Sequence, residues 1–148
     1  MLPLVAIGTP RPQGSHKHVG RGIIVDSSKY LRPWRETMRD SFEQQLPPGH
    51  VPYDEPLDVM LVFKLPKPRT VERDWPTLPP DLDKLVRACF DSCSDAGVWA
   101  DDSRVVKVIA QKEYTEFSPG VWVYIRTLDE YPLEKLGREA LPDETSTI

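Results

Sequence analysis

Hydrophobic residues are most concentrated between Leu57 and Leu65, a run interrupted by only two charged positions. Its length and its content of branched and aromatic side chains predict a β-strand at the centre of a sheet. Shorter apolar stretches predict four further strands, at residues 2–8, 22–26, 105–114 and 120–128. We expect the first two of these four to pair as a hairpin, and the last two to be joined by a hairpin loop.

Two segments carry apolar residues at the three- and four-residue spacing of an amphipathic helix. The first runs from cap candidates at Asp26 to Ser28 as far as about Gln45, and Pro33 is expected in its first turn. Its predicted buried stripe is Tyr30, Leu31, Trp34, Met38 and Phe42. The second helix ends at Gly97, a residue typical of helix C-termini. Its predicted buried stripe is Leu82, Leu85, Val86, Cys89, Phe90 and Cys93.

These elements predict a single α+β domain, with a mixed β-sheet of four to five strands flanked by two main helices. We assign the domain to residues 1–128 and interpret residues 129–148 as an acidic, partly disordered tail. The two cysteines lie on one helix face, which predicts buried thiols in a reducing compartment. The sequence has no apolar run of membrane-spanning length, so we expect no membrane association and a cytoplasmic location.

The formal net charge is −4, but the charges are unevenly distributed. Residues 127–148 carry six acidic and two basic side chains, whereas residues 11–39 carry seven basic and two acidic ones. We expect Arg32, Arg35 and Arg39 to form a basic ridge on the first helix. A basic segment attracts phosphates, which favours a nucleic acid partner; a solvated basic face is the alternative. The predicted DNA-binding residues are Arg11, Lys17, Arg21, Arg32, Arg35, Lys67, Arg69, Arg73 and Lys84.

Two pairs of carboxylates bracket the second helix. Asp81 and Asp83 stand at its start, and Asp101 and Asp102 follow it in a short turn before the next strand. If that strand lies against the start of the helix, three carboxylates meet around one point, with one contributed by the second pair. Such a cluster is a hard-oxygen site of the kind that Mg²⁺ uses. Arg87, one turn after Asp83, would then stabilise negative charge on a phosphodiester.

Each carboxylate also has a purely structural explanation. Asp81 is placed where an N-cap belongs. Asp83 and Arg87 have the i, i+4 spacing of a surface ion pair. The later pair has the composition of ordinary turn residues. Only the combination of two acids, a helix of fixed length and a second acid pair favours a metal-dependent phosphodiesterase.

The stretch from Pro80 onward resembles the signature of the RusA family of Holliday junction resolvases, which phages and prophages often carry. The resemblance rests on Asp81-Leu82-Asp83, on Phe90-Asp91 and on Trp99-Ala100-Asp101-Asp102 followed by a strand. It implies a homodimer that makes paired symmetric nicks in four-way DNA junctions with Mg²⁺ or Mn²⁺. It also implies metal-binding or catalytic roles for Asp81, Asp83 and Asp102. Within the second pair, the resemblance favours Asp102 over Asp101.

Two positions depart from the family pattern. Arg87 stands where the family has a catalytic lysine, and it keeps the charge but cannot readily donate a proton. Lys84 stands where the family has an asparagine. Two alternatives therefore stay open: a nuclease for branched or flap DNA without junction preference, and a catalytically silent module that binds DNA junctions.

Overall fold

The computed structural model describes residues 1–14, 16–19, 23–26 and 28–128. The tail that we assigned to residues 129–148 lies outside the described residues. The main sheet has four strands in the order β1 (Leu2–Ile7), β6 (Gly120–Thr127), β4 (Leu57–Pro66) and β5 (Val105–Thr115). Strands β4 and β5 are parallel and the other neighbours are antiparallel, so the predicted mixed sheet and α+β class are confirmed.

Both predicted hairpins are wrong. Strands β5 and β6 do not pair with each other, because β4 lies between them. The first two predicted strands do not pair either. Strand β3 (Ile23–Asp26) pairs with β2 (His16–Val19) in a separate two-stranded sheet, and β1 pairs with β6 instead. The reason lies in the alternation of β1, whose Leu2, Leu4 and Ala6 are all buried. Those side chains need the covered face of the main sheet, and β6 offers a matching row in which Val123 lies opposite Leu4.

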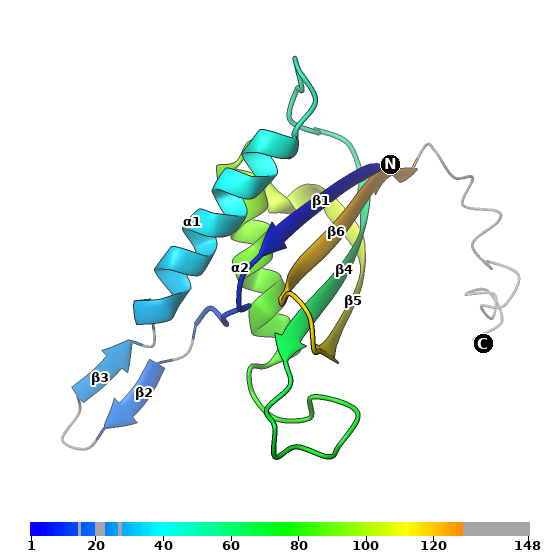
Figure 1. Cartoon of the computed structure of the whole chain (residues 1–148). Helices are drawn as coiled ribbons and strands as arrows, with labels where there is room; N and C mark the ends of the chain where they lie inside the picture. The colour runs from blue at the N-terminus through cyan, green and yellow to red at the C-terminus, as the bar shows by residue number, and fades with distance from the viewer. Residues whose placement is uncertain (15, 20–22, 27, 129–148) are drawn as a thin grey trace, which may run out of the picture.

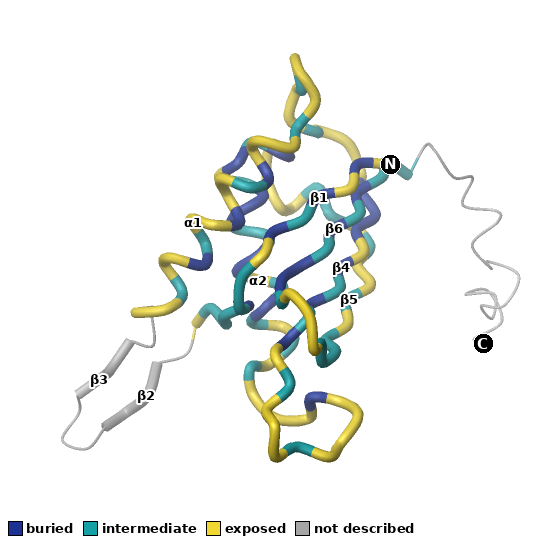
Figure 2. The backbone as a smooth tube through the Cα atoms, viewed as in Figure 1, coloured by how far each residue is buried: buried dark blue, intermediate teal, exposed yellow. Residues whose placement is uncertain are grey.

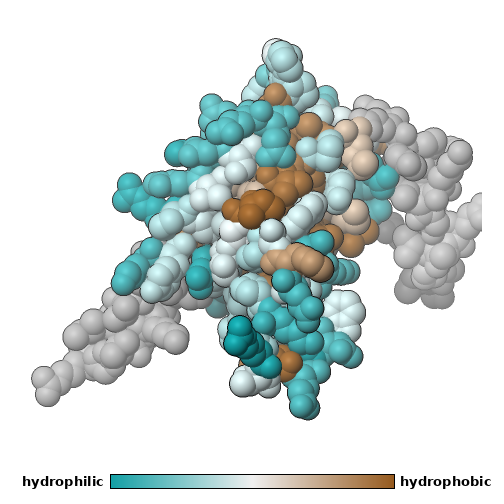
Figure 3. All heavy atoms as spheres, viewed as in Figure 1, coloured by the Kyte–Doolittle hydropathy of each residue, from teal (hydrophilic) through white to brown (hydrophobic). Residues whose placement is uncertain are grey.

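Helices α1 (Ser28–Gln45) and α2 (Leu82–Asp95) both cover the same face of the sheet (Figure 1). The core forms between the helices and this face, and its buried residues follow the sheet strands (Figure 2). Its largest fully buried side chains include Phe42, Met38, Phe63, Leu61 and Leu85. In the view of Figure 3, hydrophilic side chains gather over α1, whereas hydrophobic atoms show between α1 and the sheet.

Two details of α1 differ from the prediction. Tyr30 is 57% exposed rather than buried, and the guanidinium of Arg11 lies 5.0 Å from its ring centroid. Tyr30 therefore contributes an arginine-stacking surface, while Leu31 of the same turn packs against the core. Pro33 is the sixth residue of α1 and lies in its second turn, where it removes one backbone hydrogen bond.

The two cysteines confirm the prediction of core thiols. Cys89 and Cys93 are free and fully buried against the sheet. Burial raises the pKa of the Cys93 thiol well above its usual value, and the neighbouring Cys89 adds to that effect. Both thiols therefore act as small hydrophobic groups in the core. Across the residues that the structure describes, no helix has the length and apolar character needed to span a membrane.

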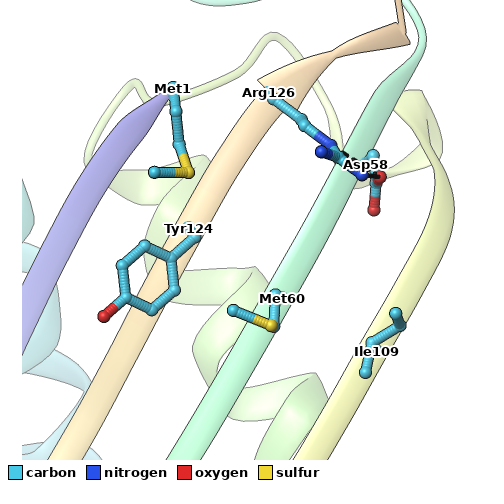
Figure 4. Close-up of a pocket in the computed structure, with 6 residues that line it drawn as sticks. All are labelled: Met1, Asp58, Met60, Ile109, Tyr124 and Arg126. Carbon is cyan, nitrogen blue, oxygen red and sulfur yellow. Dashed lines mark hydrogen bonds and ion pairs between the residues drawn. The ribbon is translucent and has the colours of Figure 1, made fainter. Parts of the chain in front are cut away.

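No helix of the described residues covers the opposite face of the sheet (Figure 1). Asp58 lies on it, only 5% exposed, and accepts hydrogen bonds from Arg126 Nε and Nη2 at 2.8 and 2.6 Å. Lys107 Nζ is 3.7 Å from the same carboxylate. The ion pair closes one end of a small apolar pocket of about 120 Å³ between Met60 and Tyr124 (Figure 4).

We expect Asp58→Ala to lower the free energy of unfolding by about 1–3 kcal/mol, because it leaves Arg126 without the buried carboxylate that it contacts. Urea denaturation at neutral pH measures the change. The matched control is Glu113→Ala, since the pair between Lys64 and Glu113 spans 3.9 Å and is about one-third exposed. That pair is expected to contribute less than about 1 kcal/mol. Equal losses of unfolding free energy in the two variants would contradict a larger contribution from the buried Asp58–Arg126 ion pair.

Candidate nuclease site

The first acid pair lies where α2 begins, beside the loop of residues 67–80 that follows β4. Asp81 occupies the N-cap position with extended backbone, but its side chain makes no capping hydrogen bond. Its carboxylate is instead 3.4 Å from Lys84 Nζ. Asp83 lies in the first turn, and both aspartates are exposed. The explanation of Asp81 as an ordinary side-chain cap is therefore wrong, and its carboxylate oxygens remain accessible.

A glycine loop packs against the start of α2 on the side of Arg87. The backbone N–H of Gln13 donates to the carbonyl of Lys84 at 3.2 Å. A β-carbon on Gly14 would stand 3.2 Å from Arg87 Nη1, so the guanidinium lies directly over this backbone. Among the described residues, no ion pair joins Asp83 to Arg87, so the predicted i, i+4 pair is wrong. The guanidinium of Arg87 and the carboxylates of Asp81 and Asp83 therefore lie at the same end of α2, beside this loop.

Lys112 is a residue of this region that sequence reasoning missed. Its ammonium reaches from β5 and donates to the carbonyls of Leu78 and Pro80, at 3.0 and 2.9 Å. These bonds hold the backbone immediately before Asp81. The only signal in the sequence is a lysine at an inward-facing position of the predicted strand, between Ala110 and Tyr114.

The second acid pair divides into two different roles. Asp101 caps the short 3-10 helix η1 (Asp102–Arg104), because its carboxylate accepts a hydrogen bond from the backbone N–H of Ser103 at 2.9 Å. Hydrogen bonding to Ser103 lowers the pKa of Asp101, and the charge of Arg104 lowers it further. The side chain of Asp102 is exposed and enters no hydrogen bond or ion pair with the described residues. Of the two, Asp102 is the carboxylate left available.

The two acid pairs do not meet within one chain. Helix α2 has 14 residues, which at a rise of 1.5 Å per residue separates its ends by about 21 Å. Strand β5 gives an independent measure, because Lys112 contacts Pro80 and lies seven residues beyond Val105, which corresponds to about 23 Å of strand. In the described part of the chain, no three His, Cys, Asp or Glu side chains form a group that could hold a metal ion.

The expectation that one chain gathers three carboxylates around one ion is therefore wrong. That expectation required the strand after α2 to begin beside the start of the helix. The strand does return along the helix, but Asp102 precedes its beginning, and β5 begins beside Leu57 at the far end of the sheet. Only the end of β5 reaches the start of α2. Asp81 and Asp83 lie at one end of the molecule, and Asp102 lies at the other.

The predicted DNA-binding residues fall into two groups. Arg11, Lys67, Arg69 and Arg73 lie on the two loops at the Asp81 end, and none of them has an ion-pair partner among the described residues. Lys84 lies there too but contacts Asp81. Lys84 thus contacts the first acid pair, and the other four cations lie on loops at the same end of the molecule. Arg21 and the side chain of Lys17 lie outside the described residues.

The basic ridge of α1 is largely neutralised by neighbouring carboxylates. Arg35 Nη2 is 3.0 Å from Asp95, and Arg32 Nε is 3.3 Å from Glu36. Arg39 contacts Asp40 at 3.1 Å. The first of these bonds also ties α1 to the end of α2. These contacts favour the alternative of a solvated surface over a ridge that tracks phosphates.

Comparison with known proteins supplies one finding. A family model described as "Endodeoxyribonuclease RusA" matches residues 3–126, which include both helices and the main sheet except for the first residue of β1 and the last residue of β6. No curated protein matches the chain.

Substitution at the second acid pair tests the division of roles between its members. We expect Asp101→Asn to lower the urea midpoint at pH 7 and Asp102→Asn to leave it unchanged, because only Asp101 accepts the Ser103 hydrogen bond. The pKa of Asp101 is lower in the folded state than in the unfolded state. Its contribution to the free energy of unfolding is therefore present above the unfolded-state pKa and is lost as the pH falls through the folded-state pKa. A midpoint shift of the same size in both variants would contradict this division.

Proposed function

The chain belongs to the RusA family of endodeoxyribonucleases, and from that premise we propose that it resolves four-way DNA junctions. In the proposed reaction, a homodimer makes paired symmetric nicks with Mg²⁺ or Mn²⁺ as the cofactor. The observation that carries the proposal is the uncapped carboxylate of Asp81, exposed together with Asp83 at the start of α2. A carboxylate that forgoes its capping hydrogen bond at a helix start is available to bind something else.

The charges around the acid pair suit a phosphodiester. Arg11, Arg69 and Arg73 lie on the loops that flank the pair, and Arg87 lies one turn into the helix. A cluster of cations raises the local concentration of DNA phosphates, although the chain as a whole is acidic. The arrangement thus combines attraction for the DNA backbone with a pair of oxygen ligands.

The donor set at this end of α2 fits a hard divalent cation. Mg²⁺ is commonly held by one or two carboxylates and completes its shell with water and substrate phosphate. Asp81 and Asp83 supply two exposed carboxylates, and Asp102 would supply a third only from a second chain. When bound, such an ion would neutralise charge on the phosphate and lower the pKa of a coordinated water.

The remaining residues act by orientation and charge. Lys112 fixes the backbone that precedes Asp81, so loss of this ammonium would loosen the position of the carboxylate. An arginine does not readily donate a proton, so Arg87 is not assigned the role of a general acid. Its role in the proposed reaction is to stabilise negative charge on the phosphate or on the leaving oxygen.

A homodimer accounts for the separation of the two acid groups. Strand β5 is an edge of the described sheet, and its Val106, Val108 and Ile109 are 60, 46 and 54% exposed. Such an edge is open to pairing with another strand. Antiparallel pairing of β5 with its copy about a two-fold axis would bring Asp102 of one chain towards Lys112 of the other, and so towards the other chain's first acid pair.

Nicking of a synthetic four-way junction tests the proposed activity. We expect Mg²⁺-dependent cleavage that EDTA abolishes and that Asp83→Asn reduces at least about a hundredfold, the scale of losing a preorganised contact to transition-state charge. Asp91→Asn, on the same helix two turns further on, is the matched control and should cleave like the wild type.

Each other result selects a different function. Cleavage that survives Asp83→Asn refutes the assigned site. A flap substrate cut as fast as the junction favours the structure-selective nuclease, and junction binding without cleavage favours the silent module.

Mixing of two inactive variants tests whether the site is shared between chains. We expect Asp83→Asn and Asp102→Asn, refolded together, to recover about a quarter of the wild-type nicking, because half of the randomly assorted dimers carry one intact site. The products should be singly nicked junctions rather than resolved duplexes, since each mixed dimer cuts one strand.

The control for this experiment mixes Asp81→Asn with Asp83→Asn. Both substitutions lie at the same end of α2, so every site in the mixed dimer carries one defect and no activity should return. The absence of recovery in the first mixture, with stable dimers present, would contradict a shared site.

A further inference from the structure

A concave pocket of about 490 Å³ opens beside the first acid pair. It lies between the loop after β1 and the long loop after β4, with the end of β5 as its third side. Prolines and leucines form most of its walls, including Pro76, which is buried, and Leu78. Pro80 belongs to the same wall and is bonded directly to Asp81. None of the roles assigned so far uses this pocket.

The lining combines an apolar slot with an aromatic ring and guanidinium groups. Tyr114 faces the pocket, and the guanidinium carbon of Arg73 lies 5.8 Å from its ring centroid. Arg11 lines the opposite loop and rests on Tyr30. Apolar walls beside guanidinium donors suit a planar ligand that has an apolar face and an edge of hydrogen-bond acceptors. A nucleobase has this chemistry, whereas a phosphate alone would leave the apolar walls without a ligand.

Several bonds hold the walls in place. Lys112 binds the carbonyls of Leu78 and Pro80, and the backbone N–H of Lys67 donates to the carbonyl of Thr115 at 3.3 Å. The bond from Gln13 to Lys84 fixes the opposite loop against α2. The pocket is therefore formed before a ligand arrives, which reduces the entropy that is lost on binding.

We propose that this pocket takes one nucleobase, displaced from stacking at the branch point, and that Arg73 reads its acceptor edge. The inference rests on the proposed function, because it concerns the nucleotide next to the phosphate that is cut. Bases at a branch point are less well stacked than bases within a duplex, so displacing one requires less free energy. The pocket would thereby give cleavage a preference for base identity at one position.

A panel of four-way junctions that differ only in the base at the crossover tests the proposal. With the full chain and Mg²⁺, we expect wild-type nicking rates to differ at least about tenfold between the best and the worst base, as for a bidentate arginine contact. Arg73→Gln should narrow the difference to within about threefold. Arg69→Gln is the matched control, because it removes an exposed arginine of the same loop that does not line the pocket. An unchanged base preference in Arg73→Gln would overturn the proposal.

A second measurement does not depend on cleavage. A junction with 2-aminopurine at the crossover, bound in EDTA, should change fluorescence with the wild type but not with Leu78→Trp, which fills the pocket from an exposed position. A fluorescence change that Leu78→Trp removes, without nicking under any metal, would support the pocket while refuting the proposed function. Nicking with no such fluorescence change would overturn the pocket while the proposed function stands.

Discussion

Packing of α2 against the sheet sets the distance between the two acid groups. Leu85, Ala88, Cys89 and Cys93 are fully buried along one side of the helix, so the helix can neither bend nor slide without opening the core. Its length then separates Asp81 from the residues that follow its C-terminus by about 21 Å. One metal ion cannot contact carboxylates that lie this far apart, so the spacing decides whether a single chain can form a complete metal site.

Local contacts fix the backbone around the candidate site at the Asp81 end of the molecule. Lys112 and the backbone of Gln13 reach the start of α2 from opposite sides and fix the two loops that surround it. Gly14 allows the guanidinium of Arg87 to lie against the loop backbone, where a larger residue would press on it at 3.2 Å. The cations of these loops remain without carboxylate partners in the described part of the chain, whereas the three arginines of α1 are paired. This contrast favours the loops at the Asp81 end, rather than α1, as the surface that attracts phosphates, which the total charge of the chain does not indicate.

Much of the fold follows from local pattern. The apolar run at Leu57 predicts the central strand, and the stripe containing Leu85 predicts the face of α2 that packs on it; both are confirmed. The partner of β1 could not be predicted this way, because pairing with β6 joins residues more than a hundred positions apart. Tyr30 was misassigned because periodicity ignores where a helix extends past the sheet. At the site, the types of the acidic residues are visible in the sequence, but the uncapped state of Asp81 and the reach of Lys112 depend on tertiary contacts.

A site divided between two chains would also explain why separated acid groups suit a junction resolvase. On the proposed arrangement, a lone chain holds only part of the ligand set, so it would have little ability to nick ordinary duplex DNA. Assembly about a two-fold axis creates two complete sites at once, and the axis relates them in the way that opposite strands of a four-way junction are related. In that proposed arrangement, the rigid spacing imposed by α2 would make dimerisation a requirement for chemistry and would present the two cuts as a symmetric pair.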